Sequence, residues 1–123
     1  MPRTTTDALN TLIARHLSGD TATALRVIEG AFGTGGVDAL GNPLPAERTR
    51  TALRTEIHRN TNVTVTRAGA VATALVVVNG DVTGPAAISE VGIFAAGGNL
   101  LAYATFAARQ IAPGTQLNFR FRI

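Results

Sequence analysis

The last eight residues of the chain constrain its fold more than any other segment. Four apolar residues alternate there with four polar ones: Leu117, Phe119, Phe121 and Ile123 against Gln116, Asn118, Arg120 and Arg122. Successive side chains of a β-strand point to opposite faces, so this period of two predicts a strand with one apolar and one polar face. The apolar face needs a core, and we therefore expect the C-terminus to be tied into a sheet.

Several shorter apolar segments upstream also read as strands. We expect strands at residues 23–32, 62–66, 71–78, 88–94 and 100–106, separated by Gly-rich or Pro-rich turns. Residues 71–78 are apolar throughout, which predicts burial on both faces, and Asn79-Gly80-Asp81 after them has the composition of a tight turn. Residues 46–58 are ambiguous, because a short helix is allowed but three threonines weaken it. Short strands at roughly ten-residue spacing predict a mainly β domain over residues 23–123, an antiparallel sandwich or barrel-like sheet.

One helix is expected before the strands, within residues 5–18. Its apolar residues follow helical spacing between positions 7 and 17: Leu9, Leu12, Ile13 and His16 or Leu17. Thr5 or Thr6 can cap its first turn, and Gly19 can end it. A helix of three turns is marginal alone in water, so it must pack on its own sheet or on a partner.

Length and composition bound the remaining possibilities. The chain has 123 residues, which suits one domain spanning 1–123, and its longest apolar segments are strand-length, too short to cross a membrane. It contains no Cys and no Lys, and its net charge is +3. A nucleic-acid-binding domain usually concentrates more positive charge than this, and Lys-free, Arg-rich usage is typical of a GC-rich coding genome.

The residues that could carry chemistry lack the required patterns. The Gly-rich segment 30–36 (GAFGTGG) has no Lys after it, so it is interpreted as a turn that needs positive φ rather than a phosphate-binding loop. Neither Ser18 nor Ser89 lies in a nucleophile elbow. Glu56 and His58 could share a strand face, but a stable metal site needs three or four ligands. We therefore expect no catalytic residues, no metal site and no cofactor.

The densest basic stretch contains Arg48, Arg50, Arg54 and Arg59. These side chains could contact phosphates. Glu47 and Glu56 interrupt the stretch, however, and no aromatic residue nearby could stack on bases. A solvated, partly ion-paired face is the favoured interpretation.

Four segments of the chain resemble phage tail-collar fibre proteins and related small virion proteins. Residues 88–94 (ISEVGIF) and 98–106 (GNLLAYATF) are similar to the family signature I-x-E-x-G-L-F-D-x-x-G-x-L-L-A-x-x-x-F. Residues 31–36 (AFGTGG) and 51–59 (TALRTEIHR) resemble its F-G-x-G and T-x-L-x-N-E-x-x-R segments. Order and spacing also match, so the resemblance covers residues 31–123. The chain departs from the pattern at Ala95, where the family has Asp, and at Thr55, where it has Asn.

The resemblance implies a non-enzymatic structural subunit of a bacteriophage virion. Its implied partners are other phage structural proteins of the tail, baseplate or capsid, and a homo-oligomer is expected. In long tail fibres this domain attaches the fibre to the particle, so an accessory docking subunit of the tail-collar or fibre-base kind is the expected function. A capsid decoration or head-fibre-base protein is the alternative within the same class, and a nucleic-acid-binding accessory protein is the alternative from another class.

Glu90, Arg120 and Arg122 are candidates for particular roles. Ile88, Glu90 and Phe94 would share one strand face, and a carboxylate among apolar neighbours must find a donor, so Glu90 is expected to be a structural anchor paired with an arginine or another hydrogen-bond donor. Arg120 and Arg122 would lie on the polar face of the last strand. They could contact a negatively charged partner, or they could guard a solvated edge against strand-to-strand aggregation.

Overall fold

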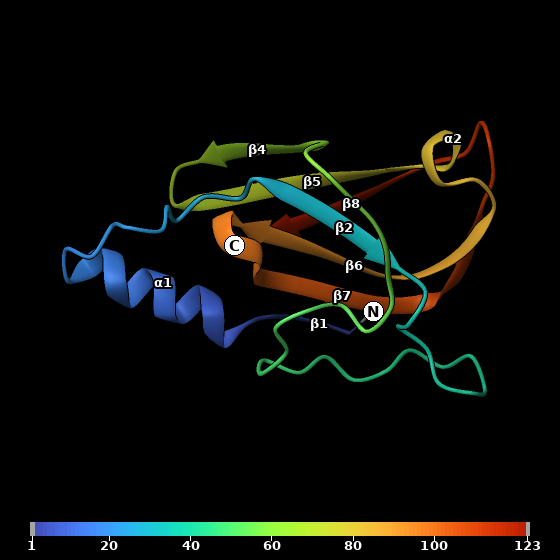
Figure 1. Cartoon of the computed structure of the whole chain (residues 1–123), viewed down its shortest axis with the longest axis horizontal. Helices are drawn as coiled ribbons and strands as arrows, with labels where there is room; N and C mark the ends of the chain where they lie inside the picture. Colours follow the sequence, from blue (N-terminus) through green and yellow to red (C-terminus); the bar gives the residue numbers. More distant parts are fainter. Residues whose placement is uncertain (1, 123) are drawn as a thin grey trace.

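The computed structural model describes residues 2–122, without the side chains of Val82 and Thr83, and it contains two antiparallel sheets packed face to face (Figure 1). The large sheet has five strands in the order β1 (Arg3–Thr5), β7 (Asn99–Ile111), β6 (Ala86–Ala95), β2 (Glu29–Gly33) and β3 (Glu56–Asn60). The small sheet has three strands in the order β4 (Val63–Ala68), β5 (Val71–Asn79) and β8 (Gln116–Arg122). The helices are α1 (Asp7–Leu17), α2 (Gly80–Thr83) and the 3₁₀ turn η1 (Ala96–Gly98). The expected mainly β, sandwich-like fold with one N-terminal helix of several turns is confirmed.

The last strand alternates as its sequence predicts. Phe119 and Phe121 are buried between the sheets, while Arg120 and Arg122 are exposed on the outer face of the small sheet. The ring of Phe119 stacks on Phe106 of β7 with centroids 4.8 Å apart, which ties the two sheets together. The predicted position of Ile123 lies outside the described residues.

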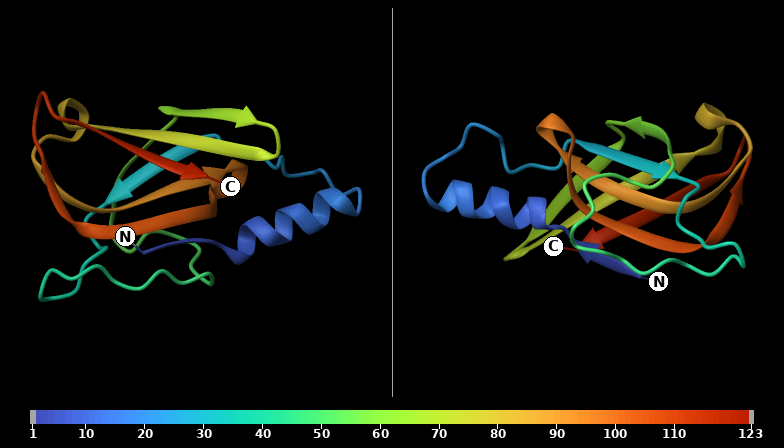
Figure 2. Two further views of the ribbon diagram at one scale, coloured as in Figure 1. Left: turned by 180° about the vertical axis from the view of Figure 1, so that it is seen from behind. Right: turned by 60° about the horizontal axis from the view of Figure 1, so that its bottom comes forward.

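Helix α1 has the predicted bounds, but it packs through only part of its apolar face. Leu9 and Leu12 are buried, whereas Ile13 is 37% and Leu17 84% exposed, because the helix runs beyond the end of the sheets (Figure 2). Thr6 occupies the N-cap position, yet its side chain does not cap the helix. Its hydroxyl instead donates to the backbone carbonyls of Leu100 and Leu101 on β7.

One predicted strand is wrong in extent, and the structure decides one segment that the sequence left ambiguous. The strand expected at 23–32 is β2, which begins only at Glu29, because its pairing partner β6 ends at Ala95 and gives earlier residues no strand to pair with. The short helix allowed at 46–58 does not form. Residues 34–55 are an irregular loop that leads into β3.

The segment around β5 also differs from the prediction. Only alternate side chains of β5 are fully buried, because the small sheet has a core on one face and solvent on the other. The turn predicted at Asn79 is the start of α2, where the Asn79 side chain accepts a hydrogen bond from the Asp81 N–H at 2.9 Å. A two-residue hairpin cannot serve here, since β5 and the next strand, β6, lie in different sheets.

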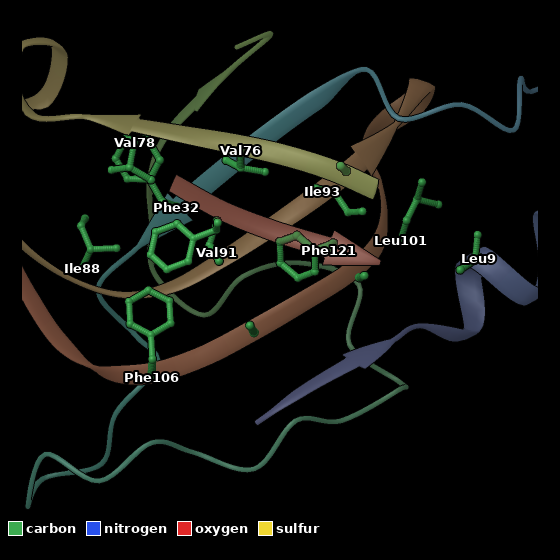
Figure 3. Packing of buried hydrophobic residues seen from close by; sticks show 14 of the residues in the cluster. Leu9, Phe32, Val76, Val78, Ile88, Val91, Ile93, Leu101, Phe106 and Phe121 are labelled. Atoms are coloured by element: carbon green, nitrogen blue, oxygen red, sulfur yellow. The ribbon is translucent and has the colours of Figure 1, made fainter. Parts of the chain in front are cut away.

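A β-bulge changes the expected faces of β6. The pairing register with β7 shifts between Ile88 and Glu90, and again between Ile93 and Phe94. Ile88 therefore points into the core between the sheets with Val91 and Ile93, rather than sharing a face with Glu90 (Figure 3). The bulge is what allows an apolar residue and a carboxylate two positions apart to occupy opposite faces.

No helix among residues 2–122 is long and apolar enough to cross a membrane.

Candidate functional site

A long loop covers the outer face of the large sheet. This covering loop, residues 34–55, connects β2 to β3 and lies across β6 and β7 (Figure 2). Leu53 from the loop packs with Phe94, Leu100 and Tyr103 of the sheet in a second apolar cluster, separate from the core between the sheets. Apolar packing alone does not fix the path of a loop whose backbone groups also need partners.

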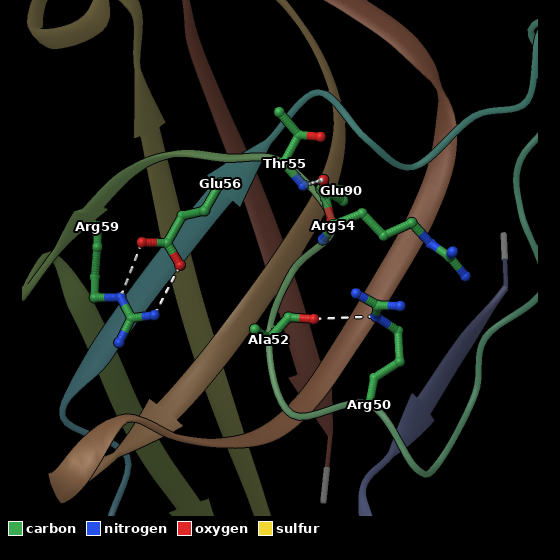
Figure 4. A network of polar contacts seen from close by, with 7 residues as sticks. All are labelled: Arg50, Ala52, Arg54, Thr55, Glu56, Arg59 and Glu90. Carbon is green, nitrogen blue, oxygen red and sulfur yellow. Dashed lines mark hydrogen bonds and ion pairs between the residues drawn. The ribbon is translucent and has the colours of Figure 1, made fainter.

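The carboxylate of Glu90 holds both ends of the covering loop. Its Oε2 accepts a hydrogen bond from Gly35 N–H at 2.7 Å. Its Oε2 also accepts one from Thr55 N–H at 2.9 Å, and its Oε1 accepts one from Arg54 N–H at 2.7 Å (Figure 4). Glu90 is only 1% exposed. Hydrogen bonds to an ionised acceptor are about twice as strong as neutral ones, so three donors can compensate a buried carboxylate.

The donors of Glu90 decide between the two expected kinds of partner. An arginine side chain or another hydrogen-bond donor was expected, and among the described residues Glu90 accepts only from backbone N–H groups. The Arg54 guanidinium instead lies 3.5 Å from the Glu47 carboxylate, and its buried Nε has no hydrogen-bond partner among the described residues. Arg54 thus serves Glu90 through its main chain only.

The Gly-rich segment is required by close approach and not by positive φ. None of Gly33, Gly35 and Gly36 has a positive φ, so the interpretation of this segment as a positive-φ turn is wrong. A Cβ on Gly35 would lie 2.7 Å from the Glu90 carboxylate, and one on Gly36 would lie 1.9 Å from the Ser89 carbonyl oxygen. Only glycine lets the loop backbone come near enough to bond β6.

Three further polar side chains of the sheet hold the covering loop. The Ser89 hydroxyl accepts a hydrogen bond from Gly36 N–H at 2.8 Å. The Tyr103 hydroxyl accepts one from Glu47 N–H at 2.5 Å, and the Thr105 hydroxyl donates one to the Leu44 carbonyl at 2.5 Å. None of these three residues was predicted to hold a loop, because their only signal in the sequence is a polar group inside an otherwise apolar strand.

The polar side chains of this arrangement are used to hold the covering loop. Ser89 and Glu90 are both buried, at 0% and 1% exposure, so neither side chain is open to solvent. Their oxygens already accept bonds from the loop backbone. Within residues 2–122 no group of three or more His, Cys, Asp or Glu side chains could hold a metal ion.

The two candidate metal ligands, Glu56 and His58, make separate contacts. His58 packs its ring 5.4 Å from that of Phe32, and Glu56 makes a two-bond ion pair with Arg59, the shorter bond being 2.7 Å (Figure 4). This hydrogen bond raises the pKa of the Arg59 guanidinium above its ordinary value, against the opposing effect of burial. The same guanidinium lies 3.8 Å from the centre of the Phe94 ring, a cation–π contact.

Most of the basic stretch is partnered. Arg48 lies 3.6 Å from Asp7, Arg54 pairs with Glu47 and Arg59 with Glu56. Arg50 donates through Nε to the Ala52 carbonyl at 3.0 Å. The partly ion-paired interpretation of this stretch is confirmed.

Arg120 and Arg122 lie on the opposite side of the sandwich from Glu90. Glu90 faces the covering loop on the outer side of the large sheet, and the two arginines are exposed on the outer side of the small sheet. The three residues singled out from the sequence therefore form two separate features.

No family model matches the chain, and no match was found among curated proteins or solved structures.

Proposed function

We propose that this chain is a non-enzymatic structural subunit of a bacteriophage particle, an accessory docking protein of the tail-collar or fibre-base kind. The observation that carries the proposal is a convergence of the resembling segments. Glu90 belongs to segment 88–94, Gly35 to segment 31–36, and Arg54 and Thr55 to segment 51–59, and all of them meet at one carboxylate. A chance likeness of short motifs gives no reason for three distant segments to bond one another.

The fourth resembling segment, 98–106, takes part in the same arrangement. Its Tyr103 and Thr105 bond the covering loop, and its Leu100 and Leu101 are buried on either side of the sheet. The residues of the pattern thus build a rigid, loop-covered sheet. This use of them supports a structural role and offers an enzyme no exposed nucleophile or acid in the same place.

A capsid decoration or head-fibre-base protein remains the alternative within the same class, since a rigid β-sandwich suits either place on a particle. The partnered arginines of the basic stretch weaken the nucleic-acid-binding alternative. Binding to DNA through phosphates would fall steeply as salt rises, which gives that alternative its own test.

Quantitative mass spectrometry of purified particles tests the proposal. Particles from the phage or prophage whose genome carries this sequence would be banded on a density gradient and washed with salt. We expect the chain at a fixed ratio to the other structural proteins across the particle band. Recovery only in the soluble lysate fractions would contradict the proposal.

A further inference from the structure

Strand β8 is an open edge of the small sheet. It pairs with β5 from Gln116 to Arg122, and it is the last strand in the order β4-β5-β8. Within residues 2–122 no backbone hydrogen bond joins its other side to any strand. A strand edge of seven residues therefore presents unused N–H and C=O groups.

A groove runs beside this edge, between the two sheets. It holds about 200 Å³ and is lined by Arg3, Thr4 and Thr5 of β1, Ala102 of β7, and Phe121 and Arg122 of β8. Strand β1 is itself the end of the large sheet, so the groove lies between the end strands of the two sheets. A cavity of about 150 Å³ can hold a benzene molecule, so this groove has room for an apolar side chain of an added strand.

The rim of the groove and the adjacent outer face of β8 carry positive charge that no carboxylate of residues 2–122 pairs. Arg3, Arg120 and Arg122 are exposed, and among the described residues no carboxylate lies within 4 Å of them. Arg48 and Arg54 of the covering loop, in contrast, lie near carboxylates of their own chain. Arg3, Arg120 and Arg122 thus bring unpaired positive charge to a strand edge whose backbone groups are also unpaired.

We propose that an extended acidic segment of another protein adds to β8 as a fourth strand of the small sheet. Residues directly opposite on neighbouring strands point to the same face, so the carboxylates of the added strand face Arg120 and Arg122. The alternate side chains of that strand are apolar and point to the groove beside Phe121. The inference rests on the proposed function, because it makes this edge the docking surface and a particle protein the source of the acidic strand.

Two other occupants fit this edge less well, a second copy of the chain and a single-stranded nucleic acid. A second copy of this chain pairing β8 with β8 would set arginine near arginine across the strands, which is destabilising. A single-stranded nucleic acid would use the charges but not the alternating N–H and C=O groups, and the one aromatic ring of the groove, Phe121, is only 5% exposed and cannot stack on bases.

A peptide titration tests the edge with the whole chain. The probe is a fluorescent peptide that alternates Asp or Glu with Val over seven residues, measured by anisotropy at low salt. Two control peptides keep its length: one replaces each acid by its amide, and one keeps the acids but carries N-methyl groups on the edge-pairing amides. We expect both controls to bind at least about tenfold more weakly, because one loses the charge pairs and the other the strand hydrogen bonds.

Variants of the chain assign the site. R120Q/R122Q should weaken the acidic peptide roughly tenfold, and R26Q/R67Q, which removes two other exposed arginines, should leave its affinity unchanged. Melting curves confirm that each variant is folded, and the single variant Arg122→Gln serves if the double variant is not. Equal binding of the N-methylated peptide, or tighter binding of a single-stranded DNA oligomer to the same arginines, would overturn the proposal.

Particle incorporation separates this inference from the proposed function. If the wild-type chain is in particles and the folded R120E/R122E variant is excluded from them, the proposed function and the β8 docking edge both stand. Full incorporation of the folded R120E/R122E variant overturns the edge as the docking surface while the proposed function stands. Absence of the wild-type chain from particles overturns the proposed function and the particle source of the strand, and the titration still decides whether the edge binds acidic strands.

Discussion

Replacing Glu90 by alanine should destabilise the fold more than any other single carboxylate change. The substitution leaves the N–H groups of Gly35, Arg54 and Thr55 without their acceptor, and each buried unpaired donor costs about 1–3 kcal/mol. Water entering the space under the covering loop would recover part of this, so we expect a loss of about 3–5 kcal/mol. That is a large share of the roughly 5–15 kcal/mol that stabilises a domain.

Glu90→Gln separates the hydrogen bonds from the volume of the side chain. The amide oxygen can replace Oε2 and keep two donors, but its NH₂ group then faces Arg54 N–H, so one donor loses its partner. We expect a loss of about 1–3 kcal/mol, intermediate between wild type and Glu90→Ala. Urea unfolding with a shared m-value gives both numbers, and Glu47→Ala, an exposed loop carboxylate, is the control that should lose less than about 1 kcal/mol. Equal stability of Glu90→Ala and wild type would refute the reasoning.

Three other predictions test the packing. Gly36→Ala should lose at least about 2 kcal/mol of folding stability, because its Cβ would lie 1.9 Å from a backbone oxygen. Gly41→Asn, in open space at φ +82°, should lose less than about 1 kcal/mol. Similar melting points for the two variants would contradict the close-approach argument. Phe119→Ala should lose about 3–5 kcal/mol in denaturant, since its ring is buried against Phe106, and a loss under about 1 kcal/mol would place that ring outside the core. Leu12→Ala should lose about 2–5 kcal/mol and Leu17→Ala almost nothing by thermal melting, and the reverse order would mean that α1 packs through its other end.

Local periodicity was sufficient to predict the elements that bury one apolar face. The alternation around Phe119 and Phe121 correctly predicted β8, and the spacing of Leu9 and Leu12 gave α1 its bounds. Periodicity could not say where the helix leaves the sheet, so the exposure of Leu17 was not predictable. That exposure depends on the lengths of strands elsewhere in the chain.

Long-range backbone bonds were the part that sequence reasoning missed. Glu90 was singled out because a buried acid needs donors, but nothing local indicates that those donors are N–H groups 35 and 55 residues away. The bulge at Ile88 is equally invisible, because it arises from pairing with β7. For the same reason the glycines of segment 30–36 were assigned to positive φ, when the true requirement at Gly35 and Gly36 was the close approach of β6.

A cryo-electron microscopy map of the intact particle tests the central claim most directly. If the chain is a docking subunit, density for the two-sheet sandwich should repeat at symmetry-related positions of the tail, baseplate or capsid, with a strand of a neighbouring protein added along β8 beside Arg120 and Arg122. A particle map in which every structural density is accounted for by other proteins would contradict the account.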